Sequence, residues 1–273
     1  MKNVLDISEH NGTIDFAKVK QAGYKDIILR LGWIGNKSNH TLDSKFEEYY
    51  TNCKRYGFNI GIYVYTYCTS LTTLRQGLEW CKNKLKNKEI NLPIFIDFED
   101  SQISSLSKTQ LTNQGLEFCK YFEKLGYKSG VYASGYWFKN KLDQSKLLNY
   151  KIWWAEYNGE SKPSSKLKVD LWQYTSSGKV NGIKGKVDIS KCMCDCNDNN
   201  NESGDFEVKE YVNGSKKETV YQDANCSKVI GYLNAKEKCS CYGIVNNKAL
   251  IVYKIDGTKN QKTGFVKWLG GIK

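Results

Sequence analysis

A regular alternation of strand-like and helix-like segments over the first 190 residues limits the possible folds of this chain more than any other feature. Apolar runs typical of buried strands recur about every 33 residues, and amphipathic stretches lie between them. Such spacing leaves room for the crossover helix that joins parallel strands. We therefore expect a parallel sheet covered by helices. The expected strands are 3–8, 26–33, 59–67, 92–99 and 128–134, and the expected helices are 14–22, 44–57, 70–88 and 107–126.

The spacing between the expected strands becomes shorter after residue 134. Three more strand-like runs follow at 151–158, 169–174 and 187–191, and the last two gaps are too short for a full crossover helix. About eight strands with few late helices predict an α/β fold in the form of an irregular barrel. In such barrels the chemistry gathers at the carboxyl ends of the strands.

A second unit follows a segment rich in Asn, Asp, Ser and Gly. Apolar periodicity is lost over 194–206, which predicts a linker between a barrel domain at 1–193 and a smaller domain at 207–273. The smaller domain has short alternating runs separated by turns, which predict a small all-β barrel.

The stretch "IFIDFEDSQ" (94–102) places negative charge at the end of an apolar strand. Asp97 and Glu99 are two residues apart, so both point to the same face of a strand. Asp6 ends the first strand in the same way, and Asp188 lies in the last. We expect these four carboxylates to meet at one rim of the barrel, with Asp6 close to Asp188 because the first and last strands of a closed barrel are neighbours.

Three readings of the carboxylates remain open from the residues alone. A close pair can divide glycoside hydrolysis between a general acid and a negatively charged partner. Three or four carboxylates can also bind calcium or magnesium. Helix capping and loop solvation are the plainest alternative, and we expect that role for Asp26 and Asp100.

Aromatic residues near the expected strand ends favour the carbohydrate reading, because flat rings with polar tips suit sugar faces, although some must belong to the core. The candidate groove residues are Tyr63, Tyr65, Tyr132, Trp154, Trp172 and Gln173.

Charge, cysteine and histidine content narrow the function classes further. The net charge of +12 suggests a polyanionic partner, but the lysines are scattered, which argues against nucleic acid. No segment approaches the length of a membrane helix, and the N-terminus lacks the pattern of a signal peptide, so we expect synthesis in the cytoplasm without membrane insertion. We expect reduced cysteines, including free exposed thiols in "KCMCDC" (191–196), and neither a metal nor a cofactor. His10 and His40, the two histidines, lie in no recognisable catalytic motif.

Five motifs in order, "VLDISEHNG", "IFIDFED", "GVYAS", "IWWAEYN" and "LWQYTSSGKVNGIKGKVDIS", resemble those of glycoside hydrolase family 25, the lysozymes of bacteria and phages. The resemblance covers about residues 1–190. It implies a flattened eight-stranded barrel and retaining cleavage of the β-1,4 bond between N-acetylmuramic acid and N-acetylglucosamine. It makes Glu99 the proton donor and Asp97 its partner, with Asp6 and Asp188 shaping the site. Glu156 departs from the expected neutral residue and would add a carboxylate near the groove.

The C-terminal part resembles bacterial SH3-like cell-wall-binding domains, mainly through "VIGYL" and "TGFVKWL". Together the parts look like a clostridial-type phage endolysin that stays in the host cytoplasm until a holin opens the membrane, and then attacks the wall of a Gram-positive host. The alternatives are an inactive wall-binding protein and a chitinase-like hydrolase. By its D-x-E spacing, Asp97 is expected to orient a reacting acetamido group of the substrate rather than to attack the sugar. The wall-binding candidates are Tyr221, Tyr232, Tyr242, Tyr253, Phe265 and Trp268.

Overall fold

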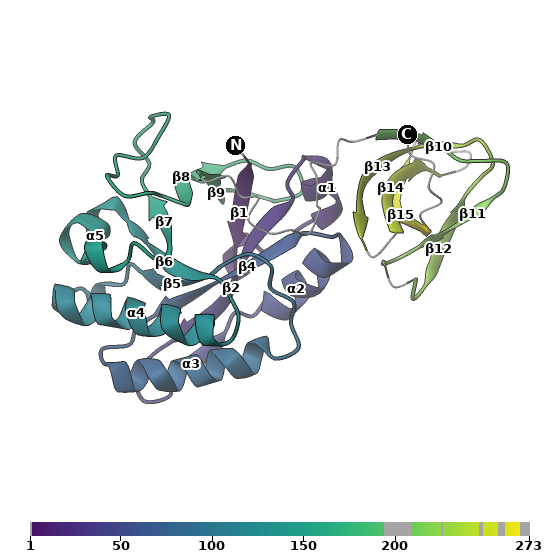
Figure 1. Cartoon of the computed structure of the whole chain (residues 1–273). Coiled ribbons are helices and arrows are strands. Elements are labelled where there is room, and N and C mark those ends of the chain that lie inside the picture. Colours follow the sequence, from purple (N-terminus) through teal and green to yellow (C-terminus); the bar gives the residue numbers. More distant parts are fainter. Residues whose placement is uncertain (1, 194–208, 225, 246–247, 256–259, 268–273) are drawn as a thin grey trace.

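A computed structural model describes residues 2–193, 209–224, 226–245, 248–255 and 260–267. The larger part is a closed barrel of eight strands with helices along one side (Figure 1). A short strand, β3 (His40–Leu42), extends β2 outside the ring as an antiparallel hairpin. The barrel strands are β1 (Asn3–Ile7), β2 (Asp26–Ile34), β4 (Asn59–Thr66), β5 (Ile94–Phe98), β6 (Ser129–Ser134), β7 (Lys151–Ala155), β8 (Leu171–Gly178) and β9 (Val187–Cys192).

The expected strands and helices are confirmed, with boundaries that differ by a few residues. Ser70 and Ser107 begin two of the helices by accepting hydrogen bonds from backbone N–H groups of the first turn. The segment "GYWFKN", which we had not expected to be helical, forms a short helix. The helices are α1 (Phe16–Gln21), α2 (Phe46–Arg55), α3 (Leu71–Leu85), α4 (Lys108–Lys124) and α5 (Gly135–Asn140).

Strand β9 closes the ring and runs antiparallel to both of its neighbours, β1 and β8, whereas the other neighbouring pairs of the ring are parallel. The connection from β8 to β9 is short, and a short connection can only reverse the chain, because a parallel return needs a crossover. The parallel arrangement expected for the first five strands is confirmed, and the last strand departs from it. The reversal still brings the beginning of β9 to the rim where the parallel strands end.

Alternation along the strands separates an interior core from an outer core. Trp153 fills the barrel interior, with ring centroids 4.6 Å from Tyr132 and 5.2 Å from Phe95, and its Nε1 donates to Ser190 Oγ. The neighbouring Trp154 points outward into the layer between strands and helices. Truncating a buried Trp typically costs about 3–5 kcal/mol, so the interior ring stabilises the barrel substantially.

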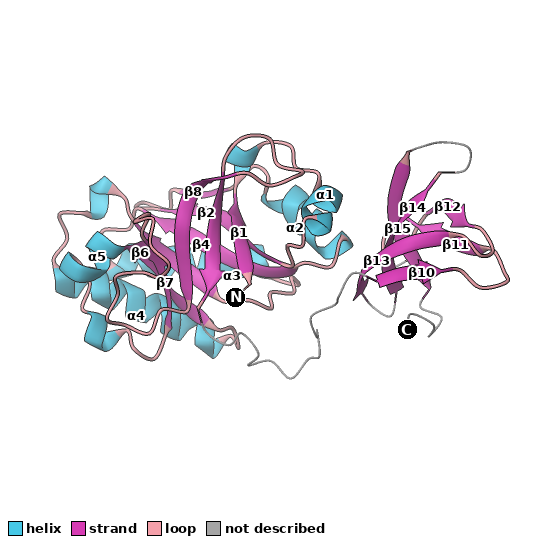
Figure 2. Ribbon diagram, turned by 90° about the horizontal axis from the view of Figure 1, so that it is seen from above, coloured by secondary structure: helices cyan, strands magenta, loops and turns pink. Residues whose placement is uncertain are grey.

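The C-terminal part is a separate six-stranded antiparallel sheet, in the order β10-β13-β14-β15-β11-β12 (Figure 2). Val220, Leu233, Ile251 and Val266 are buried at its centre. This all-β arrangement fits an SH3-like domain, while the expected linker at 194–206 lies outside the described residues. The strands are β10 (Lys209–Val212), β11 (Glu218–Tyr221), β12 (Val229–Leu233), β13 (Lys238–Val245), β14 (Lys248–Lys254) and β15 (Gln261–Lys267).

The cysteines follow the expectation only in part. Cys53, Cys68, Cys81 and Cys119 are buried free thiols, as expected. Cys192 is instead buried and disulfide-bonded, so the expectation of exposed free thiols in "KCMCDC" fails there. Cys194 and Cys196 lie outside the described residues. Among the helices that the structure describes, none has the length and apolar character to cross a bilayer.

Candidate active site

A cavity of about 600 Å³ opens at the rim where the parallel strands end. It lies over the carboxylates of β5 and β9 and beside the tyrosines that end β4. The residues that line it are Ser8, Glu9, His10, Asn11, Arg30, Trp33, Tyr63, Tyr65, Tyr67, Asp97, Glu99, Lys186, Val187 and Asp188.

Asp97 and Glu99 both reach this cavity from the end of β5, but their environments differ. Asp97 is 2% exposed, and its Oδ1 is buried without a hydrogen-bond partner in the described part of the chain. Burial, followed by the charges of Glu99 and Asp6, raises the pKa of Asp97 well above its usual range. Glu99 is open to solvent at the rim. Its carboxyl is nevertheless desolvated by the cavity walls, and this effect, together with the charges of Asp188 and Asp100, raises its pKa.

Asp6 and Asp188 occupy opposite positions in the β1–β9 pair, as expected from the closure of the barrel. Burial raises the pKa of Asp6 well above its usual range, and the charge of Asp188 adds to this effect. Gln173 Nε2 donates to Asp6 Oδ2 at 3.1 Å. Burial likewise raises the pKa of Asp188, while a hydrogen bond from Asp6 opposes the rise. The two carboxyl groups are hydrogen-bonded to each other, so they bind and release protons as a pair.

Asp100 has the helix-capping role that we expected for it. Its Oδ1 accepts from the N–H of Gln102 at 2.7 Å and caps a short 3₁₀ helix, while its Oδ2 accepts from the hydroxyl of Tyr65. Among the described residues, no three Asp, Glu, His or Cys side chains are grouped so that they could hold a metal ion.

The aromatic candidates divide between the cavity and the core. Tyr63 and Tyr65 line the cavity from β4. Tyr132 is buried in the interior and donates to Gln173 Oε1 at 2.9 Å. Trp154 and Trp172 are each 1% exposed and belong to the outer core, where Trp154 stacks on Phe138 of α5. The structure does not bring these two tryptophans to the groove, because the alternation along β7 and β8 turns them outward.

Sequence reasoning missed the basic side of the cavity. Arg30 points to the cavity from β2 and is held by Asp43 at 2.7 Å and by Glu9 at 2.9 Å, while its Nη1 lies 3.2 Å from His10 Nε2. Lys186 lines the same cavity from the β8–β9 connection. An arginine within an apolar run was a possible signal, because a charge in a buried strand needs a partner.

Glu156 does not line this cavity, contrary to the expectation of an added carboxylate in the groove. Its Oε1 and Oε2 accept from the hydroxyl and N–H of Ser164 at 2.5 and 2.7 Å. Burial disfavours the charged form, yet the Ser164 hydrogen bonds prevail and lower the pKa of Glu156. Glu156 is therefore an ionised anchor of the β7–β8 connection.

The aromatic candidates of the C-terminal sheet differ in exposure. Tyr232 is 50% exposed on the edge strand β12, with Lys217 Nζ 4.2 Å from its ring centroid. Tyr221 and Tyr242 are half-buried beside Phe265. Tyr253 and Phe265 are buried, which leaves neither ring open to a ligand. Trp268 lies outside the described residues.

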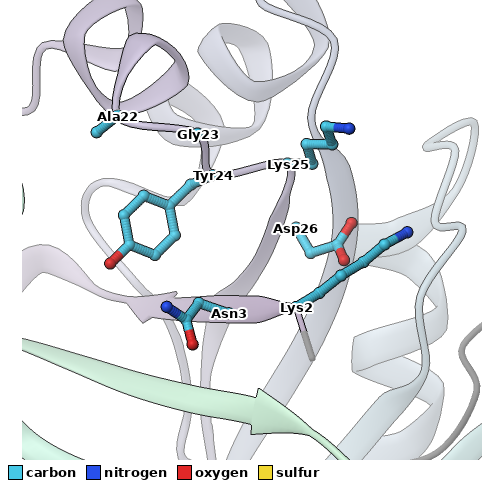
Figure 3. Close-up of a pocket in the computed structure, with 7 residues that line it drawn as sticks. All are labelled: Lys2, Asn3, Ala22, Gly23, Tyr24, Lys25 and Asp26. Carbon is cyan, nitrogen blue, oxygen red and sulfur yellow. The ribbon is translucent and has the colours of Figure 1, made fainter. Parts of the chain in front are cut away.

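A smaller cavity of about 280 Å³ lies at the opposite end of the barrel, where β1 and β2 begin (Figure 3). Lys2, Asn3, Tyr24 and Lys25 line it together with the buried Asp26. Asp26 is buried in β2 and accepts from Asn59 Nδ2 at 2.6 Å, so it neither caps a helix nor solvates a loop as expected. None of the four carboxylates discussed above lines this smaller cavity.

The comparisons with known proteins agree with this geometry. The chain is 27% identical over 187 residues to an autolytic lysozyme of Clostridium acetobutylicum, a match that covers 68% of this chain and 54% of that protein. The chain thus spans about half the length of this relative. Among solved structures, the CTP1L endolysin superposes with a TM-score of 0.62 at 27% identity, covering 70% of this chain and 66% of that one.

The catalytic domain of endolysin ply40, from bacteriophage P40 of Listeria monocytogenes, superposes with a TM-score of 0.60 at 25% identity, covering 70% of this chain and 93% of that one. Residues 5–183 match the family model of glycosyl hydrolases family 25. This match includes Asp6 of β1 and, at the end of β5, Asp97 and Glu99. The chain therefore belongs to glycosyl hydrolases family 25.

Proposed function

We propose that this protein is a muramidase that hydrolyses the β-1,4 bond between N-acetylmuramic acid and N-acetylglucosamine in peptidoglycan, with retention of configuration. The observation that carries the proposal is the D-x-E pair of β5 at the cavity, in a member of this family. Asp97 is buried and Glu99 is open to the cavity, so a glycan lying at the rim would meet Glu99 first.

Glu99 is the general acid in this proposal. A general acid must keep its proton near the working pH, and desolvation together with the charge of Asp188 favours the protonated form of Glu99. Its position at the open side of the cavity lets it reach the oxygen of the glycosidic bond. Departure of that oxygen leaves positive charge on the sugar, which the neighbouring carboxylates stabilise.

In this proposal, Asp97 binds and orients the acetamido group of the substrate. Its Oδ1 is buried without a partner in the described residues, whereas buried polar atoms are normally hydrogen-bonded. An acetamido N–H of the substrate would supply the missing donor. Asp97 would thus orient that group so that its carbonyl oxygen, rather than Asp97 itself, attacks the anomeric carbon.

The C-terminal sheet supplies wall binding as an SH3-like domain in this proposal, and the exposed Tyr232 beside Lys217 is its best-placed aromatic contact. Likeness to two endolysins supports a role in phage lysis, with the protein in the host cytoplasm until a holin gives access to the wall of a Gram-positive host. Likeness to an autolytic lysozyme supports a second candidate role, in which a bacterium turns over its own wall.

Digestion of purified peptidoglycan and identification of the new reducing end tests the proposed activity. Muramic acid at the reducing end supports the muramidase, whereas glucosamine would identify a glucosaminidase. Release from chitin at a comparable rate would favour the chitinase-like alternative. Binding of peptidoglycan without release of any fragment would favour an inactive wall-binding protein.

A further inference from the structure

The connection between β7 and β8 holds one exposed aromatic residue, Tyr157, beside the carboxylates. Its side chain is 54% exposed, although its hydroxyl donates to Gln173 Oε1 at 2.6 Å. Gln173 in turn contacts Asp6, so the tip of the side chain is tied to the site while much of its surface faces solvent. Burial of the hydroxyl, followed by the charges of Asp188 and Asp6, raises the pKa of Tyr157, which places this hydroxyl within electrostatic reach of the pair.

The order of strands puts Tyr157 across the barrel mouth from the tyrosines of β4. Going around the ring, β4 and β8 are separated by β5, β6 and β7 on one side and by β2, β1 and β9 on the other. Tyr65 and Tyr67 extend from the end of β4, and Tyr157 is tied to β8 through Gln173. Aromatic side chains thus face the mouth from two opposite sides, with the carboxylates of β5 and β9 between them.

The residue before Tyr157 is held unusually firmly for a connecting segment. The N–H of Glu156 donates to Gln173 O at 3.1 Å, and its carbonyl accepts from Trp172 Nε1 at 3.0 Å. Its carboxylate binds Ser164 through both oxygens and also accepts from Trp154 Nε1 at 3.3 Å. Lys139 of α5 completes the anchor, with Nζ 2.9 Å from Ser164 Oγ and 3.8 Å from Glu156 Oε1. A ring presented from such an anchor loses little entropy when it contacts a ligand.

We propose that Tyr157 contacts a sugar ring of the bound glycan and forms the wall of the groove opposite Tyr65 and Tyr67, and that Glu156 is the residue that positions it. This inference rests on the proposed muramidase function and adds a binding residue to it. The face of the tyrosine ring packs on the C–H face of a sugar, and the hydroxyl remains bound to Gln173. The glycan then crosses the barrel mouth between two aromatic walls, with the scissile bond over Glu99.

Glycan binding by the full chain tests this proposal in a Glu99→Gln background, where substrate is consumed far more slowly than by the parent enzyme. The probe is a purified tetrasaccharide of alternating N-acetylglucosamine and N-acetylmuramic acid. Tyr157→Ala should weaken binding on the order of 10-fold, the upper range for a lost aromatic contact, and Tyr157→Phe, which keeps the ring but loses the bond to Gln173, should weaken it much less. Tyr136→Ala, which removes a tyrosine exposed on α5, is the matched control and should have no effect.

The anchor is tested by a second pair of variants that retain Tyr157. Glu156→Ala should also weaken glycan binding, as Tyr157→Ala does. Glu156→Gln keeps an acceptor for Ser164, so it should bind the glycan much more tightly than Glu156→Ala. In the active enzyme, both Tyr157→Ala and Glu156→Ala should raise KM more than they lower kcat. Parent-like binding by Tyr157→Ala overturns the proposal, as does an equal loss in Tyr157→Phe, which would assign the effect to the hydroxyl. Absence of binding by the parent would instead remove the proposed function itself.

Discussion

Asp6 and Asp188 lie directly opposite each other where the first and last strands of the barrel pair. The site thus contains two acidic pairs: a D-x-E pair at the end of β5, and a cross-strand pair on β1 and β9 that is joined by a hydrogen bond. Because the charge of Asp188 contributes to the raised pKa of Glu99, the second pair helps to set the protonation of the first.

Asp188→Asn should move the basic limb of the pH–rate profile to lower pH. The charge of Asp188 raises the pKa of Glu99, so removing that charge lowers it, and Glu99 then loses its proton at a lower pH. The measurement is kcat/KM against pH on soluble peptidoglycan fragments, with Asp143→Asn, at a half-buried helix cap, as control. An unchanged basic limb would show that Asp188 does not tune the acid.

Glu99→Gln should lower turnover by about 10²–10⁴-fold, the usual contribution of general acid catalysis, while binding persists. The amide keeps the size of the side chain but cannot donate the catalytic proton. Release of reducing ends is measured beside that of Glu160→Gln, which alters an exposed residue of the same domain. A folded Glu99→Gln enzyme with near-normal activity would refute the assignment of Glu99 as the acid.

Asp97→Asn should make the protein more stable at pH 7 while impairing catalysis. The pKa of Asp97 is raised in the folded state, so its contribution to stability is present at low pH and is lost as the pH rises through that folded pKa. The neutral amide avoids this loss, and we expect a gain in Tm on the order of a few degrees at pH 7. The gain should shrink near pH 4, and thermal unfolding at both pH values measures it. An equal gain at both would contradict the ionisation argument.

The role of Asp97 can be decided by attempted trapping. If the substrate's acetamido group is the nucleophile, a slow-leaving fluorosugar should give no adduct on the "IFIDFED" peptide. Glycan lacking the N-acetyl group on muramic acid should also be cut far more slowly, even where it binds. Peptide mass spectrometry checks the first outcome, and a glycosylated Asp97 would instead make this residue the nucleophile.

Residues 207–273, produced alone, should bind cell walls without lysing cells, because the expected wall-binding surface is separate from the carboxylates of the barrel. Tyr232→Ala should weaken this binding, whereas Lys254→Ala, which alters an exposed residue of β14, should not. Sedimentation with purified walls provides the measurement. Retention of the Tyr232→Ala protein at the level of the unmodified fragment would exclude Tyr232 as a contact.

The sequence predicted the barrel well because apolar residues recur with different periods in strands and in helices. Each expected segment showed only one of these two periods. It predicted the meeting of Asp6, Asp97, Glu99 and Asp188 because strand ends converge at one rim. It failed on the tryptophans because alternation says that Trp153 and Trp154 face opposite ways without saying which one faces inward. The hydrogen bonds of Glu156 were not predicted because its partner, Ser164, lies in the irregular connection between β7 and β8. Such a segment has no periodic pattern of apolar residues from which contacts can be predicted.

The insertion of β9 between β1 and β8 has a consequence for the making of the protein. A chain that has left the ribosome only as far as β8 already carries Asp6, Asp97 and Glu99, but it lacks both Asp188 and the strand that seals the ring. The four carboxylates are therefore brought together only when the last barrel strand is inserted between β1 and β8.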